Sequence, residues 1–235
     1  MLARSDWRAE EVVRLFLCVM VAFVVAGLAQ RGFVFKETGG WAGLVAGQSV
    51  FDLLVLASVH WFLRSHKVSW TIAFGIQSRP VGRVLGIGFL AGMAFLPAAY
   101  GLQWLVTRLL SGYGIELPPQ RSVEILIEAG PAGRVFLYGA AAIGAPMVEE
   151  VLFRGVLFAA LRNAGWPRTA LVGSALFFGA IHLNLGAALP LVAFGLLLAL
   201  LYEQTGSLLA PIAAHIAFNT APFVMLIVGV KFGTK

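Results

Sequence analysis

The stretch "PMVEEVLFRGVLF", residues 146–158, places two adjacent glutamates and an arginine inside an otherwise apolar segment. A charged side chain at the centre of a membrane helix costs about 2.5 to 3.5 kcal/mol on insertion scales, so such residues usually face a cavity or a partner. On a helix, Glu150 and Arg154 are four residues apart and share one face, with the acid preceding the base. Glu149 has only apolar residues three and four positions later, so its partner is expected on another helix.

The rest of the chain has the composition of a membrane protein. Of its 235 residues, 60% are hydrophobic and only 12% are charged, and the mean hydropathy is +0.88. These values lie far outside the range of soluble globular domains. The formal net charge of +6 is not taken as a sign of nucleic-acid binding, because lysine and arginine in a membrane protein report mainly on topology and anionic headgroups. Cys18 is the sole cysteine, which excludes an internal disulfide and a cysteine-based metal site.

Apolar stretches of the length expected for membrane helices recur along the chain. They lie near residues 12–29, 41–63, 84–110, 134–161, 169–183, 189–203 and 208–230. The fifth and sixth are short, so one of them is a candidate for a re-entrant segment, and Pro146 is a candidate kink in the long fourth. We therefore expect an all-α polytopic membrane protein, with about seven to eight transmembrane helices around a polar catalytic cavity inside the membrane.

Residues 1–235 are expected to form a single transmembrane domain, with N-terminal helices at about 12–110 and a catalytic core at about 134–220. The polar connection at 111–133 predicts a short helix on the membrane surface. The first apolar run follows basic residues, as in a signal peptide, but it is longer than the usual apolar core of such a peptide. This length favours a retained first helix.

The distribution of basic residues predicts the orientation of the bundle. With the N-terminus in the cytoplasm, the cytoplasmic side receives a small majority of the lysines and arginines, including the dense cluster of Arg64, Lys67, Arg79 and Arg83. This pattern favours a cytoplasmic N-terminus.

Two of the four histidines lie inside the apolar helices, and the other two, His60 and His66, lie at the end of the second span, where an interfacial role is expected. With a rise of 1.5 Å per residue from the shared membrane side, Glu149, His182 and Asn219 lie about 20 Å deep, and His215 lies about 14 Å deep. A single histidine or asparagine in a membrane helix usually makes an interhelical hydrogen bond. Convergence of these four polar groups instead favours a site.

Other polar or motif-like residues are given structural interpretations. Asp52, Gln48 and Gln103 have no matching polar set around them, and Phe178, one turn before His182, is expected to be a packing residue.

A glutamate beside a histidine in a wet pocket suits the activation of water for attack on a peptide carbonyl. A second histidine and an asparagine amide can then donate hydrogen bonds to the oxyanion. The HExxH zinc motif, the GxGD aspartyl motif and the GxSG serine motif are all absent from the sequence. These observations predict an intramembrane peptidase.

Three ordered motifs also resemble a known family. Glu149-Glu150-x-x-x-Arg154, Phe178-x-x-x-His182 and His215-x-x-x-Asn219 lie on successive apolar helices. They are similar to the motifs of the CPBP family, the CAAX-protease and bacteriocin-processing intramembrane proteases, also called the Abi family. The likeness covers roughly residues 134–220.

The resemblance implies roles for the residues that carry it. Glu149 and His182 are expected to activate water, His215 and Asn219 to stabilise the oxyanion, and Glu150 and Arg154 to support them. A metal-free, glutamate-type mechanism is the expectation, so no cofactor is required. The alternative is a zinc enzyme in which Glu149, His182 and His215 are the ligands.

The expected substrate is a membrane-associated protein or peptide, cleaved within the lipid bilayer of a prokaryotic cytoplasmic (inner) membrane. Relatives remove the last three residues of prenylated proteins, process peptides, confer bacteriocin immunity or trim sorting signals, and the sequence does not choose among these. Two other classes remain open: a non-catalytic immunity or scaffold protein, and a small transporter or channel that uses the buried charges as an ion path.

Overall fold

A computed structural model describes residues 7–32, 40–77, 79–117 and 121–227, and within these residues the chain is helical without strands. Five helices are long and apolar enough to cross a membrane: α1 (Ala9–Gly32), α2 (Trp41–Ser65), α4 (Val81–Gly112), the continuous helix Pro131–Asn163, and α10 (Leu185–Thr205). Two shorter apolar helices, Thr169–Ile181 and α11 (Leu209–Ile227), complete the bundle in the described residues. The expected all-α polytopic membrane fold is confirmed.

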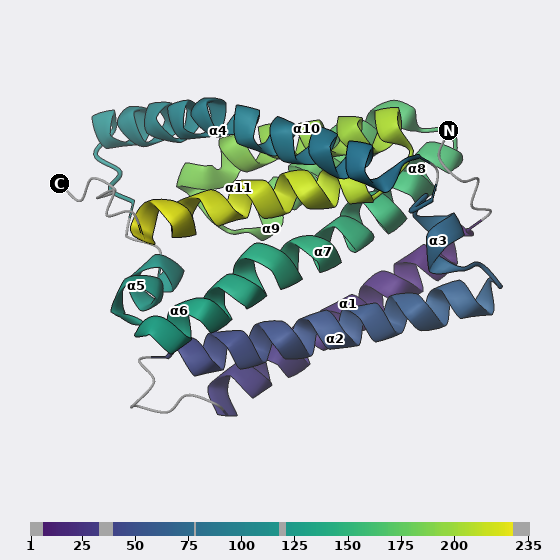
Figure 1. The fold of residues 1–235 in the computed structure, drawn as a ribbon, viewed down its shortest axis with the longest axis horizontal. Helices are drawn as coiled ribbons and strands as arrows, with labels where there is room; N and C mark the ends of the chain where they lie inside the picture. The colour runs from purple at the N-terminus through teal and green to yellow at the C-terminus, as the bar shows by residue number, and fades with distance from the viewer. Residues whose placement is uncertain (1–6, 33–39, 78, 118–120, 228–235) are drawn as a thin grey trace.

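The helix Pro131–Asn163, here called the central helix, carries both glutamates of the opening motif. It comprises α6 (Pro131–Tyr138), α7 (Ala145–Glu150) and α8 (Ala159–Asn163), joined by wider π-type turns at Gly139–Gly144 and Val151–Phe158. Figure 1 shows it running diagonally between the α1–α2 pair and the layer formed by α4, α10 and α11. Pro146 therefore lies inside a continuous helix, directly after a π-type turn that accommodates it.

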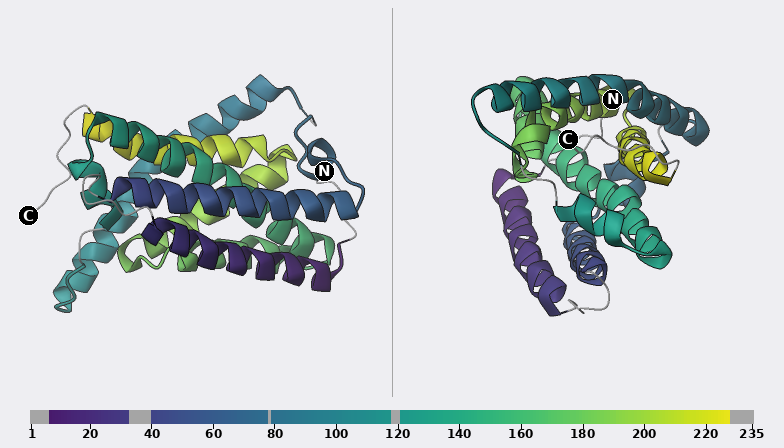
Figure 2. Two further views of the ribbon diagram at one scale, coloured as in Figure 1. Left: turned by 90° about the horizontal axis from the view of Figure 1, so that it is seen from below. Right: turned by 90° about the vertical axis from the view of Figure 1, so that its left-hand side faces the viewer.

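The N-terminal pair α1–α2 packs along a narrow stripe. Buried residues of α1 recur at spacings of three and four, the pattern of one helix face: Val12, Leu15, Val19, Ala22 and Ala26. At the end where α2 finishes, the Nε2 atom of His66 lies 3.1 Å from the Oε2 atom of Glu11. These contacts hold the pair together along the side of the central helix, as the two views of Figure 2 show.

The helix Thr169–Ile181, which contains α9 (Ser174–Ile181), is too short to cross the membrane by itself. Its 13 residues span about 20 Å, whereas the hydrocarbon core is about 30 Å thick. The chain reverses at His182, Leu183 and Asn184, where Leu183 has a φ of +48° and the Asn184 side chain caps α10. This turn places His182, whose side chain is exposed, directly after α9.

Helices α4 and α11 pack together through glycines one turn apart. A Cβ atom at Gly88 would collide with the carbonyl oxygen of Ala210, and one at Gly92 with the carbonyl oxygen of Ala214. Small residues at this spacing let membrane helices approach closely. Because Ala214 directly precedes His215, this contact sets the position of the histidine relative to the rest of the bundle.

Gly92→Ala is expected to destabilise the protein by about 1–3 kcal/mol, because the added methyl group must push α4 away from α11. Gly86→Ala on the same helix is the matched control, since a Cβ atom there meets nothing within 4 Å. Thermal unfolding in detergent measures the difference. Equal melting temperatures for the two variants would contradict this account of the packing.

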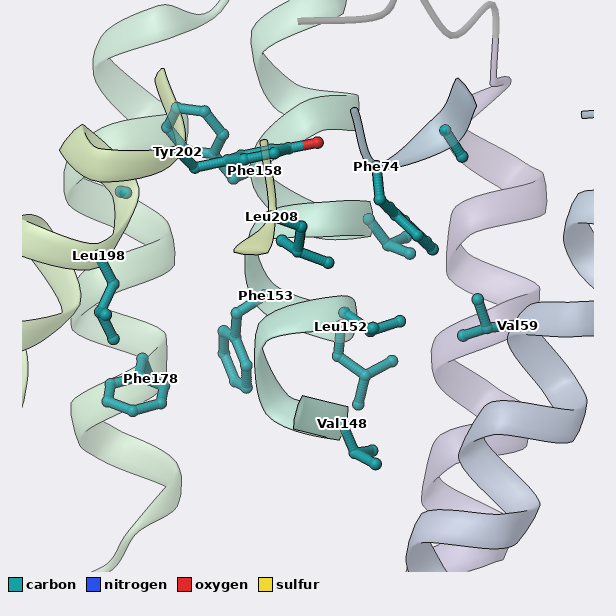
Figure 3. Packing of buried hydrophobic residues seen from close by; sticks show 14 of the residues in the cluster. Val59, Phe74, Val148, Leu152, Phe153, Phe158, Phe178, Leu198, Tyr202 and Leu208 are labelled. Atoms are coloured by element: carbon teal, nitrogen blue, oxygen red, sulfur yellow. The ribbon is translucent and has the colours of Figure 1, made fainter. Parts of the chain in front are cut away.

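The short helix α3 (Trp70–Ala73) follows the end of α2 and leads to Phe74, which contacts the central helix and the start of α11. Phe74, which follows it, is buried against Gly155 of the central helix, where a Cβ atom would lie 2.6 Å from the Cε1 atom of Phe74. The carbonyl oxygen of Phe74 accepts a hydrogen bond of 2.9 Å from the N–H of Leu208. Figure 3 shows Phe74 and Leu208 beside the ribbon that carries Leu152 and Phe153.

Candidate active site

Glu150, Arg154 and His215 form a connected chain of hydrogen bonds inside the bundle. The Oε1 atom of Glu150 accepts from the Nη1 atom of Arg154 at 2.8 Å and lies 2.8 Å from the Nδ1 atom of His215. Glu150 and Arg154 are 0% exposed and His215 is 2% exposed. An ionised carboxylate only accepts hydrogen bonds, so Nδ1 of His215 is the protonated nitrogen in this contact. The carboxylate of Glu150 thereby fixes the orientation of the imidazole.

Arg154 is held from three sides. Besides Glu150, its Nη2 atom donates a hydrogen bond of 3.0 Å to the carbonyl oxygen of Gly195 on α10. Its guanidinium carbon lies 4.6 Å from the centre of the Phe178 ring, a cation–π geometry. The predicted Glu150–Arg154 pair is therefore present, and it also connects the central helix to α9 and α10.

Glu149 approaches the opposite nitrogen of the same imidazole. Its Oε2 atom lies 3.7 Å from the Nε2 atom of His215, and its side chain is 23% exposed. That oxygen is buried and has no hydrogen-bond partner in the described structure. The expected partner on another helix is thus His215. An unpartnered carboxylate oxygen beside an imidazole nitrogen is a position at which water can be bound and deprotonated.

His182 directly follows α9, and its ring contacts the Phe178 ring, which also contacts His215. Its Nδ1 atom lies 2.7 Å from the carbonyl oxygen of Phe178, so Nδ1 carries the proton and Nε2 is left free. The Phe178 ring centre lies 4.8 Å from that of His182 and 5.6 Å from that of His215. Within the described residues no hydrogen bond or ion pair joins His182 to Glu149.

Asn219 is positioned by an irregularity of the central helix. In the π-type turn, the N–H of Ala145 donates to the carbonyl of Ala140, five residues earlier. With the same spacing of five residues, the carbonyl of Ala141 would accept a hydrogen bond from the N–H of residue 146. That residue is Pro146, which has no N–H. The Nδ2 atom of Asn219 donates to that carbonyl instead, at 3.2 Å. One hydrogen of the amide is fixed in this way, and the second remains available to another acceptor.

A cavity of about 280 Å³ adjoins Asn219 on the side away from His215. Its walls come from α4, α10, α11 and the π-type turn, and they are mostly apolar, with Tyr100, Gln103 and Asn219 as the polar residues. The carboxylates of Glu149 and Glu150 are outside its lining. The catalytic cavity expected from the sequence is therefore divided into an apolar pocket at Asn219 and a charged cluster one turn away along α11.

Phe178 and Asp52, which the sequence interpretation left as structural, lie against this cluster, as does Phe194, which it did not name. Phe178 touches both histidines and Arg154, as described above, and Phe194 stands edge-on to His215 with ring centres 5.4 Å apart. Asp52 of α2 accepts a hydrogen bond of 2.8 Å from Gln48 and approaches the central helix at Gly144, where a Cβ atom would lie 3.0 Å from its Oδ2 atom. It is also close enough to Glu149 to interact electrostatically.

Asp52 thus has the polar neighbours that its sequence context did not reveal, and its interpretation as an isolated structural residue is incomplete. A glycine five residues after another in the segment "GAAAIG" is only a weak indication of such a contact.

Comparison with known proteins finds similarity in the segment that contains the candidate site. Residues 131–221 match a family model described as type II CAAX prenyl endopeptidase Rce1-like. The matched segment is thus similar to CAAX-type membrane endopeptidases, in agreement with the CPBP-like motifs that it contains. It is also 28% identical over 136 residues to YdiL of Bacillus subtilis (strain 168), a candidate membrane peptidase by its name. This match covers 58% of the chain and 54% of the relative, and no solved structure matches significantly.

The family-model match begins with the central helix and ends just after Asn219. It therefore includes every residue of the predicted site, while α1, α2 and α4 lie outside it. The catalytic roles of Glu149, His182, His215 and Asn219 stay predictions, as does the division of the chain into N-terminal helices and core.

The residues named for a zinc site do not form a ligand set. Zinc needs three or four nitrogen, oxygen or sulfur ligands at about 2 Å around one point. Among the described residues no group of three histidine, cysteine, aspartate or glutamate side chains could hold a metal ion. The Nδ1 atom of His215 is engaged by Glu150, and the Nδ1 atom of His182 by the carbonyl oxygen of Phe178.

Proposed function

We propose that the protein is an intramembrane endopeptidase that hydrolyses a peptide bond of a membrane-associated protein or peptide. The observation that carries the proposal is the arrangement of Glu149 beside His215, whose other nitrogen is anchored by the buried Glu150–Arg154 pair. The family-model match and the membrane-spanning fold support the same reaction class. We place the protein in a prokaryotic cytoplasmic membrane.

In the proposed reaction Glu149 is the general base. A water molecule beside its unpartnered oxygen gives a proton to the carboxylate as the water oxygen bonds to the carbonyl carbon of the substrate. The tetrahedral intermediate then collapses: the C–N bond breaks, and the proton held by Glu149 passes to the leaving nitrogen. In this proposal the free Nε2 atom of His182 helps to orient the water.

Asn219 and His215 are proposed to stabilise the oxyanion. The second hydrogen of the Asn219 amide is available for this donation, while the first fixes the side chain to Ala141. Because Glu150 accepts the Nδ1–H of His215, this histidine can donate to an oxyanion only through a protonated Nε2. Loss of one such donor in other hydrolases reduces turnover by about 10²–10³-fold.

The test compares membrane proteins from cells that make the wild-type chain, the Glu149→Gln variant or neither. Terminal-peptide mass spectrometry is expected to find new termini that depend on the wild-type chain alone. If cells that express the wild-type chain show no termini beyond those of cells that make neither chain, hydrolysis is excluded. A binding role, such as that of an immunity or scaffold protein, would then be favoured.

Purified protein is expected to remain active after exhaustive chelation, and metal analysis of the active sample should find no stoichiometric zinc. The physical reason is that the amide of Asn219 supplies the carbonyl polarisation that a zinc ion would otherwise supply. Loss of activity on chelation with recovery on adding one equivalent of zinc would overturn the metal-free mechanism. A control with chelator saturated with calcium separates metal removal from occupation of the pocket.

Pro146→Ala is expected to lower activity by up to about 10²-fold with little loss of stability. The alanine N–H can pair with the carbonyl of Ala141, and Asn219 then loses the partner that orients it. The measurements are turnover and thermal unfolding, with Pro190→Ala of α10 as a control for removing a proline from a helix. Unchanged turnover in Pro146→Ala would remove this proline from the positioning of Asn219.

A further inference from the structure

A second pocket lies at the opposite end of the bundle from α5 (Arg121–Glu128), where α2 ends and α3 begins (Figure 1). Its volume is about 450 Å³, and it is lined by His60, Leu63, Arg64, Lys67, Val68, Ser69 and Trp70. None of these residues belongs to the candidate active site. Because α2 is an apolar helix of membrane-spanning length, its end lies at the depth of the lipid headgroups.

Two cations of this pocket lack an acidic partner. Arg64 and Lys67 are exposed, and within the described residues neither forms an ion pair. The sequence contains no acidic residue between Asp52 and Glu116. At the same end of the bundle, by contrast, Arg162 pairs with Glu203 at 2.6 Å. The pocket therefore concentrates positive charge that no acidic side chain of the described segments pairs with.

The backbone that presents Lys67 is strained. The N–H of Lys67 donates to the carbonyl of Arg64, and the N–H of Val68 to that of Leu63, which closes the end of α2. In this motif the residue at the position of Lys67 adopts a left-handed conformation and is usually glycine. Lys67 has a φ of +55°. A lysine at a position that favours glycine points to a use for its ammonium group.

The aromatic wall of the pocket is fixed by a hydrogen bond. The indole N–H of Trp70 donates to the Nδ1 atom of His60 at 3.1 Å. In a neutral imidazole whose Nδ1 accepts, Nε2 carries the proton, so His60 retains a second donor. Tryptophan is enriched at the level of the headgroups, where its ring is partly apolar and partly hydrated. The pocket thus combines two cations, a histidine donor and an interfacial indole.

We propose that this pocket binds the phosphate of an anionic phospholipid headgroup. Arg64 and Lys67 supply charge-assisted hydrogen bonds to the phosphate oxygens, and the apolar surface of α2 accommodates the acyl chains of the same lipid. A lipid is favoured over a soluble anion because the pocket lies at the end of a membrane-spanning helix.

Lipid binding at this pocket would act on the candidate active site through α3. Trp70 packs edge-on against Phe74, with ring centres 5.3 Å apart, and Phe74 is seated on Gly155 of the central helix. Gly155 directly follows Arg154. A headgroup that holds Trp70 in place therefore also holds the segment that packs next to the Glu150–Arg154 pair.

The test uses the full-length protein in detergent with added phosphatidylglycerol or phosphatidylcholine, analysed by native mass spectrometry and thermal unfolding. Wild type is expected to retain phosphatidylglycerol preferentially. Loss of each cation should weaken this preference about fivefold, so Arg64→Gln with Lys67→Gln should nearly abolish it. The charge-preserving pair Arg64→Lys with Lys67→Arg should keep most of it.

The matched control is Arg31→Gln with Arg108→Gln, which removes two exposed cations from the other end of the bundle. An equal loss in this control would show a general charge effect and overturn the site. Inorganic phosphate is tested as a third added ligand. If it raises the melting temperature as much as phosphatidylglycerol does, the site binds a soluble anion and the lipid proposal fails. No preference for phosphatidylglycerol in wild type would also overturn it.

Discussion

Glu149→Gln is expected to reduce peptide hydrolysis by about 10²–10⁴-fold while the protein folds and inserts normally. Glutamine keeps the size of the side chain but cannot accept the proton of the attacking water. The Oε2 atom of Glu149 makes no hydrogen bond in the described structure, and the Nε2 atom of His215 lies 3.7 Å from it. Replacing the Glu149 carboxylate therefore leaves no buried donor without a partner. The substitution should lower turnover and leave stability nearly unchanged.

The control for this prediction is Glu203→Gln, which removes a glutamate of α10 whose partner Arg162 lies outside the site. That variant should retain full turnover. The measurement is single-turnover hydrolysis at equal protein concentration, together with thermal unfolding of each variant. Full activity of Glu149→Gln would remove Glu149 from the mechanism and would leave His182 and His215 as the remaining candidate bases.

Arg154→Ala is expected to lower the stability of the protein by about 3–5 kcal/mol, the largest effect of any single substitution considered. Its removal would leave the buried carboxylate of Glu150 without its cation and the carbonyl of Gly195 without its donor. The Phe178 ring would also lose the guanidinium stacked over it. We expect low yield, a strongly reduced melting temperature and lost activity together.

A second variant separates the structural from the chemical role of the pair. Glu150→Leu with Arg154→Met removes both charges and retains apolar volume, so it should recover much of the stability lost in Arg154→Ala. It should nevertheless remain inactive, because His215 loses the acceptor that fixes its Nδ1–H. A stable but inactive Arg154→Ala would instead assign the arginine a direct part in the chemistry, and an active double variant would remove Glu150 from the orientation of His215.

Features that depend on spacing within one helix were predictable from the sequence. The membrane spans follow from the length of the apolar runs, and the Glu150–Arg154 pair follows from the helical period, because residues four apart meet on one face. The shortness of the Thr169–Ile181 helix was visible in the same way. Depth arithmetic along straight helices also placed Glu149, His182, His215 and Asn219 at similar levels.

The pairing of these groups could not be predicted, because depth along a helix does not determine which way a side chain points or how closely two helices approach. Glu149 was expected to act with His182, but the described contact is with His215, and the ring of Phe178 contacts both histidines. The distance between α4 and α11 is set by Gly88 and Gly92 of α4, because a side chain there would collide with the backbone of Ala210 and Ala214 of α11. That contact involves residues more than 100 positions apart in the chain.

The sequence by itself determined an all-helical membrane protein with a charged motif on one helix. Only the tertiary structure decided that Glu150 orients His215, that Asp52 lies against Gly144, and that Asn219 takes the carbonyl that Pro146 leaves free. The physical reason is that helical periodicity acts over a few neighbouring residues. Contacts between helices depend instead on local π-type turns and on glycines that set the distance between backbones.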